Sequence, residues 1–188
     1  MENYSFNIYN KCCSNGICAA LDTLNKNKIN PVFICIGSDL VLGDSLGPLV
    51  GTFLRNKNIP NYIYGTLKAP ITAKEVDYAG KLIENTHKNS ICIAIDAAVG
   101  EVGDIGLIRV VDRGLKPGLG VNKNLNLIGD ISIIAVVAEK SLKNESLLNL
   151  TRLNLVYKMA EEISNGIEQH LKTLAKYNKE QFENLYGA

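Results

Sequence analysis

The sequence contains only two histidines, carries almost no net charge and has no long apolar run. Lys and Arg total 20 against 19 Asp and Glu, which gives a net charge of +1. This balance gives no electrostatic reason to expect binding to nucleic acid or to an anionic membrane. No segment reaches the apolar length of a membrane span, and the polar start lacks the basic-then-apolar pattern of a signal peptide. We therefore expect a cytoplasmic protein, and the charge balance leaves peptides and small molecules open as ligands.

The five cysteines are an odd number, and Cys35 and Cys92 fall in apolar runs typical of buried strands. Structural disulfides are therefore not expected, which suits a reducing compartment. Cys12, Cys13 and Cys18 lie close together, but no second group of Cys or His supplies the remaining ligands of a metal site. The positions of the two histidines also argue against a Ser or Cys triad. We expect no metal and no cofactor.

The stretch 34–50 runs from an apolar strand through a glycine-punctuated loop into the start of a helix. The continuous apolar run at 32–36 is typical of a strand that is buried on both faces. Ser45 is a candidate N-cap, and Pro48 is tolerated in the first helical turn. A helix start presents free N–H groups at the carboxyl end of the preceding strand. This stretch therefore predicts a binding site, with Asp44 in its turn.

Apolar periodicity along the chain predicts an α/β fold with a doubly wound, mostly parallel sheet. The expected strands lie at 32–36, 61–67, 91–95, 107–111 and 130–137, and the expected helices at 14–26, 45–56, 72–86 and 145–174. The strand at 107–111 follows a glycine-rich break instead of a helix, so the sheet is expected to be mixed. We treat residues 1–188 as one domain, with residues 1–13 and 177–188 loosely ordered.

Two carboxylates follow expected strands, Asp44 after the first and Asp96 at the end of the third. In an open α/β sheet, ligands bind beyond the carboxyl ends of the strands, where the strand order reverses. If the order begins with strands two, one and three, both carboxylates converge on that crevice. Two nearby carboxylates can share a proton, one acting as a base toward water and the other donating a hydrogen bond. Alternatively, Asp44 caps the turn into the helix and Asp96 satisfies backbone N–H groups at a strand end.

The same residues carry a resemblance to a known family. Six segments, in one order within about residues 31–160, resemble the signature of the YyaC-type sporulation proteins of spore-forming bacteria: 35–39, 43–51, 64–67, 95–97, 115–123 and 151–155. That family is similar to the spore germination protease and, more distantly, to the hydrogenase maturation proteases. The resemblance implies a three-layer α/β/α fold and a peptidase activity toward a spore or sporulation protein. It also implies the cytoplasm of a sporulating cell, forespore or spore as the location.

The resemblance assigns roles to residues as well. In the germination protease the proposed catalytic carboxylates lie in an Asp-Ala-Leu-Gly-Pro-Leu motif and an Ile-Asp-Ala motif, which match Asp44 and Asp96. The hydrogenase maturation relatives use a histidine to hold the nickel of their substrate, and neither His87 nor His170 matches it. We expect the substrate to be bound within or beside the same motifs, by Ser38, Asp39, Gly43, Ser45, Pro70, Lys116, Gly118 and Lys123.

Two segments depart from the family pattern near the expected crevice. Residues 68–72 read Lys-Ala-Pro-Ile-Thr where relatives usually carry an acidic residue and a histidine, and residues 40–42 read Leu-Val-Leu where relatives tend to be polar or basic. Lys116 and Lys123 either position a substrate carbonyl or carboxylate or are simply solvated. The sequence thus favours an aspartic-type endopeptidase. The alternative is a non-catalytic sporulation protein that binds a protein or peptide partner in the same crevice.

Overall fold

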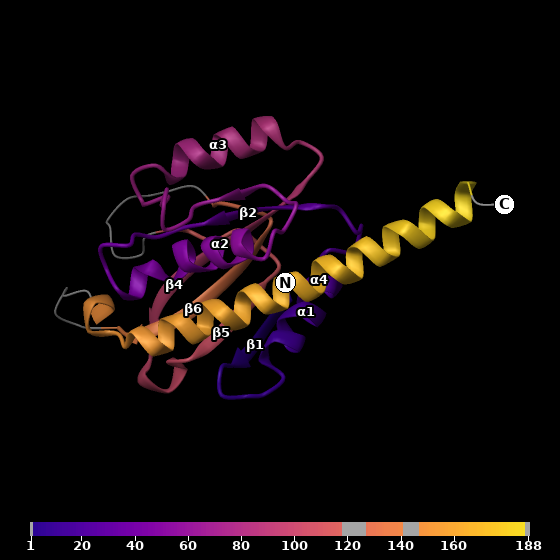
Figure 1. Ribbon diagram of the computed structural model, residues 1–188. Helices are drawn as coiled ribbons and strands as arrows, with labels where there is room; N and C mark the ends of the chain where they lie inside the picture. Colours follow the sequence, from indigo (N-terminus) through magenta and orange to yellow (C-terminus); the bar gives the residue numbers. More distant parts are fainter. Residues whose placement is uncertain (1, 118–126, 141–146, 187–188) are drawn as a thin grey trace.

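The computed structural model describes residues 2–117, 127–140 and 147–186, which form a six-stranded sheet with helices on both faces (Figure 1). The strands are β1 (Asn3–Asn7), β2 (Pro31–Cys35), β3 (Ile63–Tyr64), β4 (Ile91–Gly100), β5 (Leu107–Val111) and β6 (Ile131–Glu139). The α-helices are α1 (Cys13–Leu24), α2 (Leu46–Asn56), α3 (Val76–Thr86) and α4 (Leu153–Tyr186). Three short 3₁₀ turns are η1 (Gly43–Ser45), η2 (Val102–Asp104) and η3 (Leu147–Leu150). In the described part of the chain, no helix is both long and apolar enough to cross a membrane.

The sheet has the strand order β1-β5-β6-β4-β2-β3. β3, β2, β4 and β6 are parallel, whereas β5 is antiparallel to β6 and β1 is antiparallel to β5. The mostly parallel, mixed sheet expected from the sequence is thus confirmed. The order β3-β2-β4 is also the reversal that was expected, so the crevice of an open α/β sheet lies at the carboxyl ends of β2 and β4.

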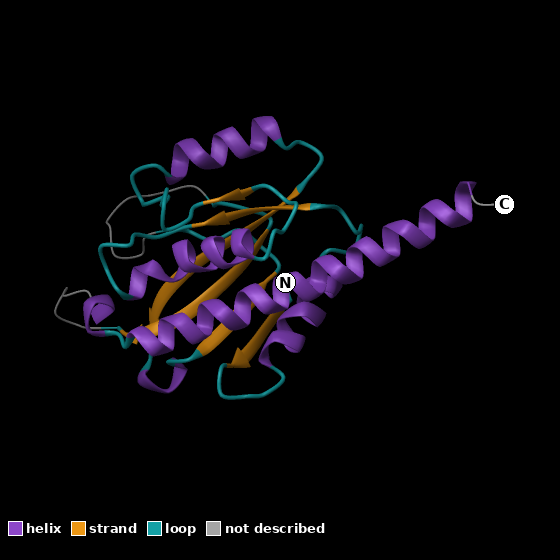
Figure 2. Ribbon diagram, in the orientation of Figure 1, coloured by secondary structure: helices purple, strands orange, loops and turns teal. Residues whose placement is uncertain are grey.

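The two faces of the sheet are buried under different layers, which Figure 2 shows with the helices in purple. One face packs Phe33, Ile95 and Ile133 against α1, α2 and α4. The other face packs Val32, Ile34 and Ala94 against α3 and against Leu115 and Ile128, which form an isolated bridge. Strand residues therefore alternate between the two cores, as the period of a strand requires. This three-layer arrangement agrees with the one implied by the resemblance.

Both ends of the chain are more ordered than the sequence suggested. Residues 3–7 form β1, in which Tyr4 and Phe6 are half-buried and alternate with exposed residues. The expectation of a loose start was therefore wrong, because alternation with a period of two was present in a short polar context. Residues 177–186 continue α4 as helix, which extends past the body of the molecule in Figure 1. The expected loose tail was wrong over this range.

The expected helix caps also differ from the observed ones. α1 begins at Cys13, and the backbone N–H of Ser14 donates to the Glu162 carboxylate on α4 (2.9 Å). The first turn of α1 is thus partly satisfied by a residue distant in sequence, which no local pattern reveals. Ser45 does precede α2, but its hydroxyl donates backwards to the Leu42 carbonyl (2.6 Å) and makes no capping bond.

Candidate functional site

The candidate site begins where β2 ends and β4 continues. The Ile36 N–H donates to the Ile95 carbonyl (2.8 Å), which is the last bond between these two strands. β4 then runs on to Gly100, paired with β6, so Asp96 lies within the strand and not at its end as expected. Asp96 therefore stands beside the point at which its neighbour strand stops. This leaves an opening above β2, bordered by the loop 37–45.

Gly37 and Gly47 allow this loop to lie directly on the end of β2. Gly37 has a φ of +143°, and a Cβ atom there would lie 2.0 Å from the Asp44 carbonyl oxygen. A Cβ at Gly47 would lie 2.0 Å from the Ile36 carbonyl oxygen. Both positions therefore exclude a side chain. The close contact brings the start of α2 against the carboxyl end of β2, so the backbone of Asp44 is held directly above the strand.

Asp44 lies in η1, half-buried, with its backbone fixed to the strand end. Its carbonyl accepts from the Ser38 N–H (3.2 Å). Burial raises the pKa of the Asp44 carboxyl above its ordinary value, and a hydrogen bond from the backbone of Ser38 offsets this in part. Among the described residues no cation contributes to this shift. Asp44 is thus a carboxylate taken out of water without a compensating charge, a condition that clusters at functional sites.

Asp96 is more deeply buried, at 8% exposure, and its Oδ1 accepts from the Ala97 N–H (2.8 Å). Its neighbour Ile95 packs in the core beneath α2 and α4, so strand alternation directs Asp96 toward the α3 side of the sheet. Asp44 comes from the loop that enters α2 on the opposite side. The two side chains can meet only beyond the end of β2, where no strand separates them. The structure therefore puts the two residues at one edge, and their pairing stays a prediction.

The other expected substrate-binding residues fall into three groups. Ser38, Asp39, Gly43 and Ser45 belong to the loop above β2, where the Ser38 hydroxyl accepts from the Leu40 N–H (3.2 Å). Pro70 precedes Ile71, whose carbonyl accepts from the Gly37 N–H (2.9 Å), so this segment borders the same opening. Lys116 is exposed beside the buried Leu115. Gly118 and Lys123 lie outside the described residues.

Sequence reasoning missed a second border of the loop. A Cβ at Gly43 would lie 2.9 Å from the Leu148 carbonyl oxygen, so η3 packs directly on η1. Leu150 and Leu153 follow on this side and are exposed, as is Leu40 at 88%. No periodic pattern predicts this contact, because η3 is a single short turn between β6 and α4. In the described part of the chain, no three His, Cys, Asp or Glu side chains are grouped closely enough to hold a metal ion together.

Comparison with known proteins assigns the chain to a family. A family model described as "Protein of unknown function (DUF1256)" matches residues 4–166. The chain belongs to this family. A protein named "Uncharacterized protein YyaC" from Bacillus subtilis (strain 168) is 40% identical over 137 residues, which cover 72% of this chain and 67% of that protein. The resemblance to YyaC-type proteins is thereby confirmed, whereas its connection to sporulation stays a prediction.

One solved structure of similar shape is the [NiFe] hydrogenase maturation protease HycI from Thermococcus kodakarensis KOD1. The likeness covers 79% of this chain and 98% of that one, with a TM-score of 0.48 and 18% sequence identity.

Proposed function

We propose that this member of the family is an aspartic-type endopeptidase in which Asp44 and Asp96 form the catalytic dyad. The observation that carries the proposal is the half-buried carboxyl of Asp44 at the edge where Asp96 also lies, with its pKa raised by burial and no cation among the described residues to oppose the shift. A structural cap does not need this burial, because an exposed Asp caps equally well. A carboxyl that must donate a proton near neutral pH does need it.

The environments of the two carboxylates suggest different roles. Burial favours the protonated form of Asp44, which can donate a hydrogen bond to the carbonyl oxygen of a scissile peptide. Asp96, whose Oδ1 accepts from the Ala97 N–H, is then assigned the other role, that of the base that takes a proton from water. The resulting hydroxide adds to the carbonyl carbon, and the tetrahedral intermediate expels the amine after a proton returns to nitrogen. Water is consumed and one peptide bond is broken, with no other reactant.

The proposed substrate is a spore or sporulation protein, as the YyaC-type resemblance implies. The test is incubation of the purified protein with small acid-soluble spore proteins, followed by mass spectrometry of the products. We expect defined fragments in which one new carboxyl terminus and one new amino terminus arise at a single bond. Intact substrate after prolonged incubation, with an Asp44→Asn variant giving the same spectrum, would count against peptidase activity toward these proteins.

A second function, non-catalytic binding of a protein partner, is favoured by a different observation. Leu40 is 88% exposed in the loop above β2, and Leu150 and Leu153 are exposed on the segment that packs against this loop. Exposed apolar side chains grouped around an opening are typical of a contact surface. Detectable binding of the spore proteins without cleavage would favour this function. Cleavage that is lost with Leu40→Ser would instead assign these leucines to substrate binding by the peptidase.

A further inference from the structure

The open edge of the sheet at β3 has backbone groups that point away from the sheet. Among the described strands β3 is at the end of the sheet and pairs with β2 alone, and the Phe33 N–H donates to the Tyr62 carbonyl (3.0 Å). In a parallel pair the bonding residues alternate along the strand, so Ile63 directs its N–H and C=O outward. The Ile63 carbonyl accepts from Nη2 of Arg55 (3.1 Å). Arg55 therefore reaches from the end of α2 to the free edge of the strand.

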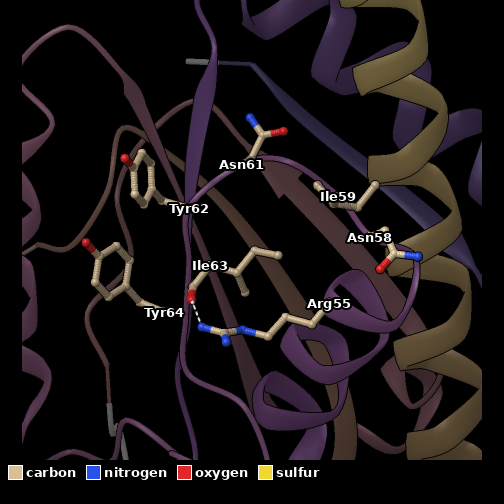
Figure 3. A pocket seen from close by; sticks show the side chains of 7 residues that line it. All are labelled: Arg55, Asn58, Ile59, Asn61, Tyr62, Ile63 and Tyr64. Atoms are coloured by element: carbon tan, nitrogen blue, oxygen red, sulfur yellow. Dashed lines mark hydrogen bonds between the residues drawn. The ribbon is translucent and has the colours of Figure 1, made fainter.

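Arg55 lines an open cavity of about 560 Å³ beside this edge (Figure 3). A guanidinium has five N–H donors, and in the described part of the chain the Ile63 carbonyl takes one of them. None of the ion pairs between described residues involves Arg55. The guanidinium at this cavity is thus not paired with a carboxylate of any described residue. The ligand expected in this cavity is a carboxylate, because its two oxygens match the planar N–H donors of a guanidinium.

The walls of the cavity are held in place before any ligand arrives. Asn58 has a φ of 54°, and its N–H donates to the Arg55 carbonyl (2.9 Å), which closes the turn after α2. The Asn61 side chain donates to the Pro31 carbonyl (2.9 Å), which ties the approach to β3 onto β2. A site whose walls are already fixed loses less entropy on binding.

The opposite side of the same strand carries flat rings. Figure 3 shows the Tyr62 and Tyr64 rings on one side of the strand and Arg55 and Ile63 on the other. Tyr62 is 66% exposed, with its ring centroid 4.4 Å from that of His87. Tyr64 is fixed by a hydrogen bond between its hydroxyl and Nε2 of His87 (2.8 Å). A strand laid along this edge would send alternate side chains to the cation and to the rings.

We propose that the β3 edge binds an extended peptide as an added strand, with a carboxylate of that peptide on Arg55 and the adjacent side chain on Tyr62. Main-chain bonds at Ile63 would supply affinity, and the carboxylate would supply specificity. The carboxylate can be an Asp or Glu side chain or a chain terminus, since both offer the same two oxygens. Alternatively, Arg55 could serve only to cover the edge of β3 and prevent unwanted strand pairing. Its remaining N–H donors would then bind water and not a ligand.

This site is separate from the carboxyl edge. Arg55 follows Asp44 by eleven residues of mostly helical chain, which corresponds to roughly 16 Å along α2. The binding of a peptide at Arg55 does not depend on catalysis. A role of the β3 edge in holding a substrate for cleavage does rest on the proposed peptidase function. Binding and cleavage therefore need separate measurements.

The binding test uses the full chain and a capped hexapeptide of sequence Thr-Val-Glu-Tyr-Val-Thr. Two further probes replace Glu by Gln, one with a capped and one with a free carboxyl terminus. We expect the Glu peptide to shift the NMR signal of the Ile63 amide and to bind about tenfold more tightly than the capped Gln peptide. If the Gln peptide with the free terminus binds as tightly as the Glu peptide, the terminus also serves as the carboxylate.

The variants assign this preference to one side chain. Arg55→Gln keeps a donor for the Ile63 carbonyl and should abolish the preference for Glu, whereas Arg55→Lys should retain part of it. Arg113→Gln removes the same charge from another exposed position and should change nothing. The proposal is overturned if no probe moves the Ile63 amide, if Glu and capped Gln peptides bind alike, or if Arg113→Gln has the effect of Arg55→Gln.

A second arm separates this site from the proposed peptidase. Binding is repeated in a protein carrying Asp44→Asn and Asp96→Asn, where the preference for Glu should persist. Cleavage of an acidic substrate should show a raised KM in Arg55→Gln with kcat little changed. Binding without any cleavage would refute the peptidase and leave the β3 site standing. Cleavage with a KM indifferent to Arg55 would refute its role in holding substrate.

Discussion

Two aspartates show how differently this fold removes a carboxylate from water. Asp22, on α1, accepts a hydrogen bond from Nδ1 of the fully buried His170 on α4 (2.7 Å), and Nζ of Lys28 lies 4.0 Å away. Asp44 is half-buried above β2, and burial raises its pKa with no cation to oppose the shift in the described residues. The first carboxylate has partners that join two helices. In the second, a backbone hydrogen bond from Ser38 is what opposes the effect of burial on the pKa.

This difference indicates which of the two has been kept for chemistry. A buried charge with a hydrogen-bonded partner holds a structure together, and it can often be replaced by apolar groups without loss. A partly buried carboxylate without a charged partner lowers stability, so its presence needs another reason. The reason proposed for Asp44 is catalysis together with Asp96.

The largest effect is expected from Asp44→Asn and Asp96→Asn. Asn is close to Asp in size but cannot share or transfer the proton, so each change should reduce turnover by several orders of magnitude. The double variant should be scarcely slower than either single one, because the two groups act as a unit. The free energy of unfolding should change by no more than about 1 kcal/mol in each case. Peptide cleavage and thermal melting of the three variants measure both quantities.

Asp22→Asn is the matched control for these variants. It should lower stability by roughly 1–2 kcal/mol, because His170 loses a charged partner, and leave the specific activity of the folded protein unchanged. If Asp44→Asn lost stability while keeping its activity, and Asp22→Asn behaved the same way, both aspartates would be structural. The contrast between them would then disappear.

The next effect concerns the backbone contact that places Asp44. Gly47→Ala puts a methyl group 2.0 Å from the Ile36 carbonyl oxygen, so the start of α2 must move away from the strand. We expect a loss of roughly 3 kcal/mol in the free energy of unfolding, as for other overpacked sites. Gly103→Ala has no atom within 4 Å of the added methyl and should be nearly neutral. Urea denaturation of both variants tests this, and equal stabilities would show that the loop does not depend on the contact.

The sequence predicted the framework of this site well because the relevant signals are local. Continuous apolar runs and the helices between them predicted β2 and β4 as parallel strands, and the strand order two-one-three, which was considered as a condition, put Asp44 and Asp96 at one edge. β1 was missed because its alternating Tyr4 and Phe6 span a single short edge strand. The end of α4 was missed because the side chains at 177–184 are exposed and most of them are polar. There, pairs four residues apart, such as Lys176 with Glu180, favour the helix without apolar packing.

The contacts that shape the site could not be read in the same way. Ile71 and Leu148 border the loop above β2 from segments that are distant in sequence, and no periodic pattern connects them to Gly37 or Gly43. The Glu162 carboxylate at the start of α1 is a similar case, since it lies 148 residues from Ser14. Spacing rules describe neighbours within an element. Contacts between elements depend on how the layers are finally packed.

The pair formed by Asp22 and His170 predicts that the stability of the protein depends on pH. Burial lowers the pKa of His170 below its ordinary 6.5, against the opposing effect of Asp22. Just below pH 6.5, His170 therefore binds a proton in the unfolded chain but stays neutral in the folded protein. Stability should therefore fall as the pH drops from about 6.5 toward the lower pKa of the folded state. His170→Gln should remove this slope, and denaturation curves measured across the range would show it. An unchanged slope in the variant would exclude His170 as its origin.

The smallest effect is expected at Glu168, a carboxylate with two lysine partners whose side chain is 25% exposed. It accepts from Lys172 and from Lys57, both at 2.6 Å, and these bonds hold its pKa below the ordinary value, with Lys172 contributing most. Because this carboxyl is more acidic in the folded state, its stabilising contribution is present above its ordinary pKa and is lost as the pH falls through the folded value.

Glu168→Gln should therefore cost no more than about 1 kcal/mol near neutral pH and nothing in strong acid, since partly exposed ion pairs are weak. Lys57→Met breaks only the bond between the end of α2 and α4, whereas Lys172→Met breaks only the pair within α4. If Lys57→Met reproduced the loss seen in Glu168→Gln and Lys172→Met did not, the bond between the helices would account for the stabilisation. Equal losses would assign it to the charge of Glu168 itself. A loss well above 1 kcal/mol would mean that the ion pairs of Glu168 are stronger than partly exposed ion pairs normally are.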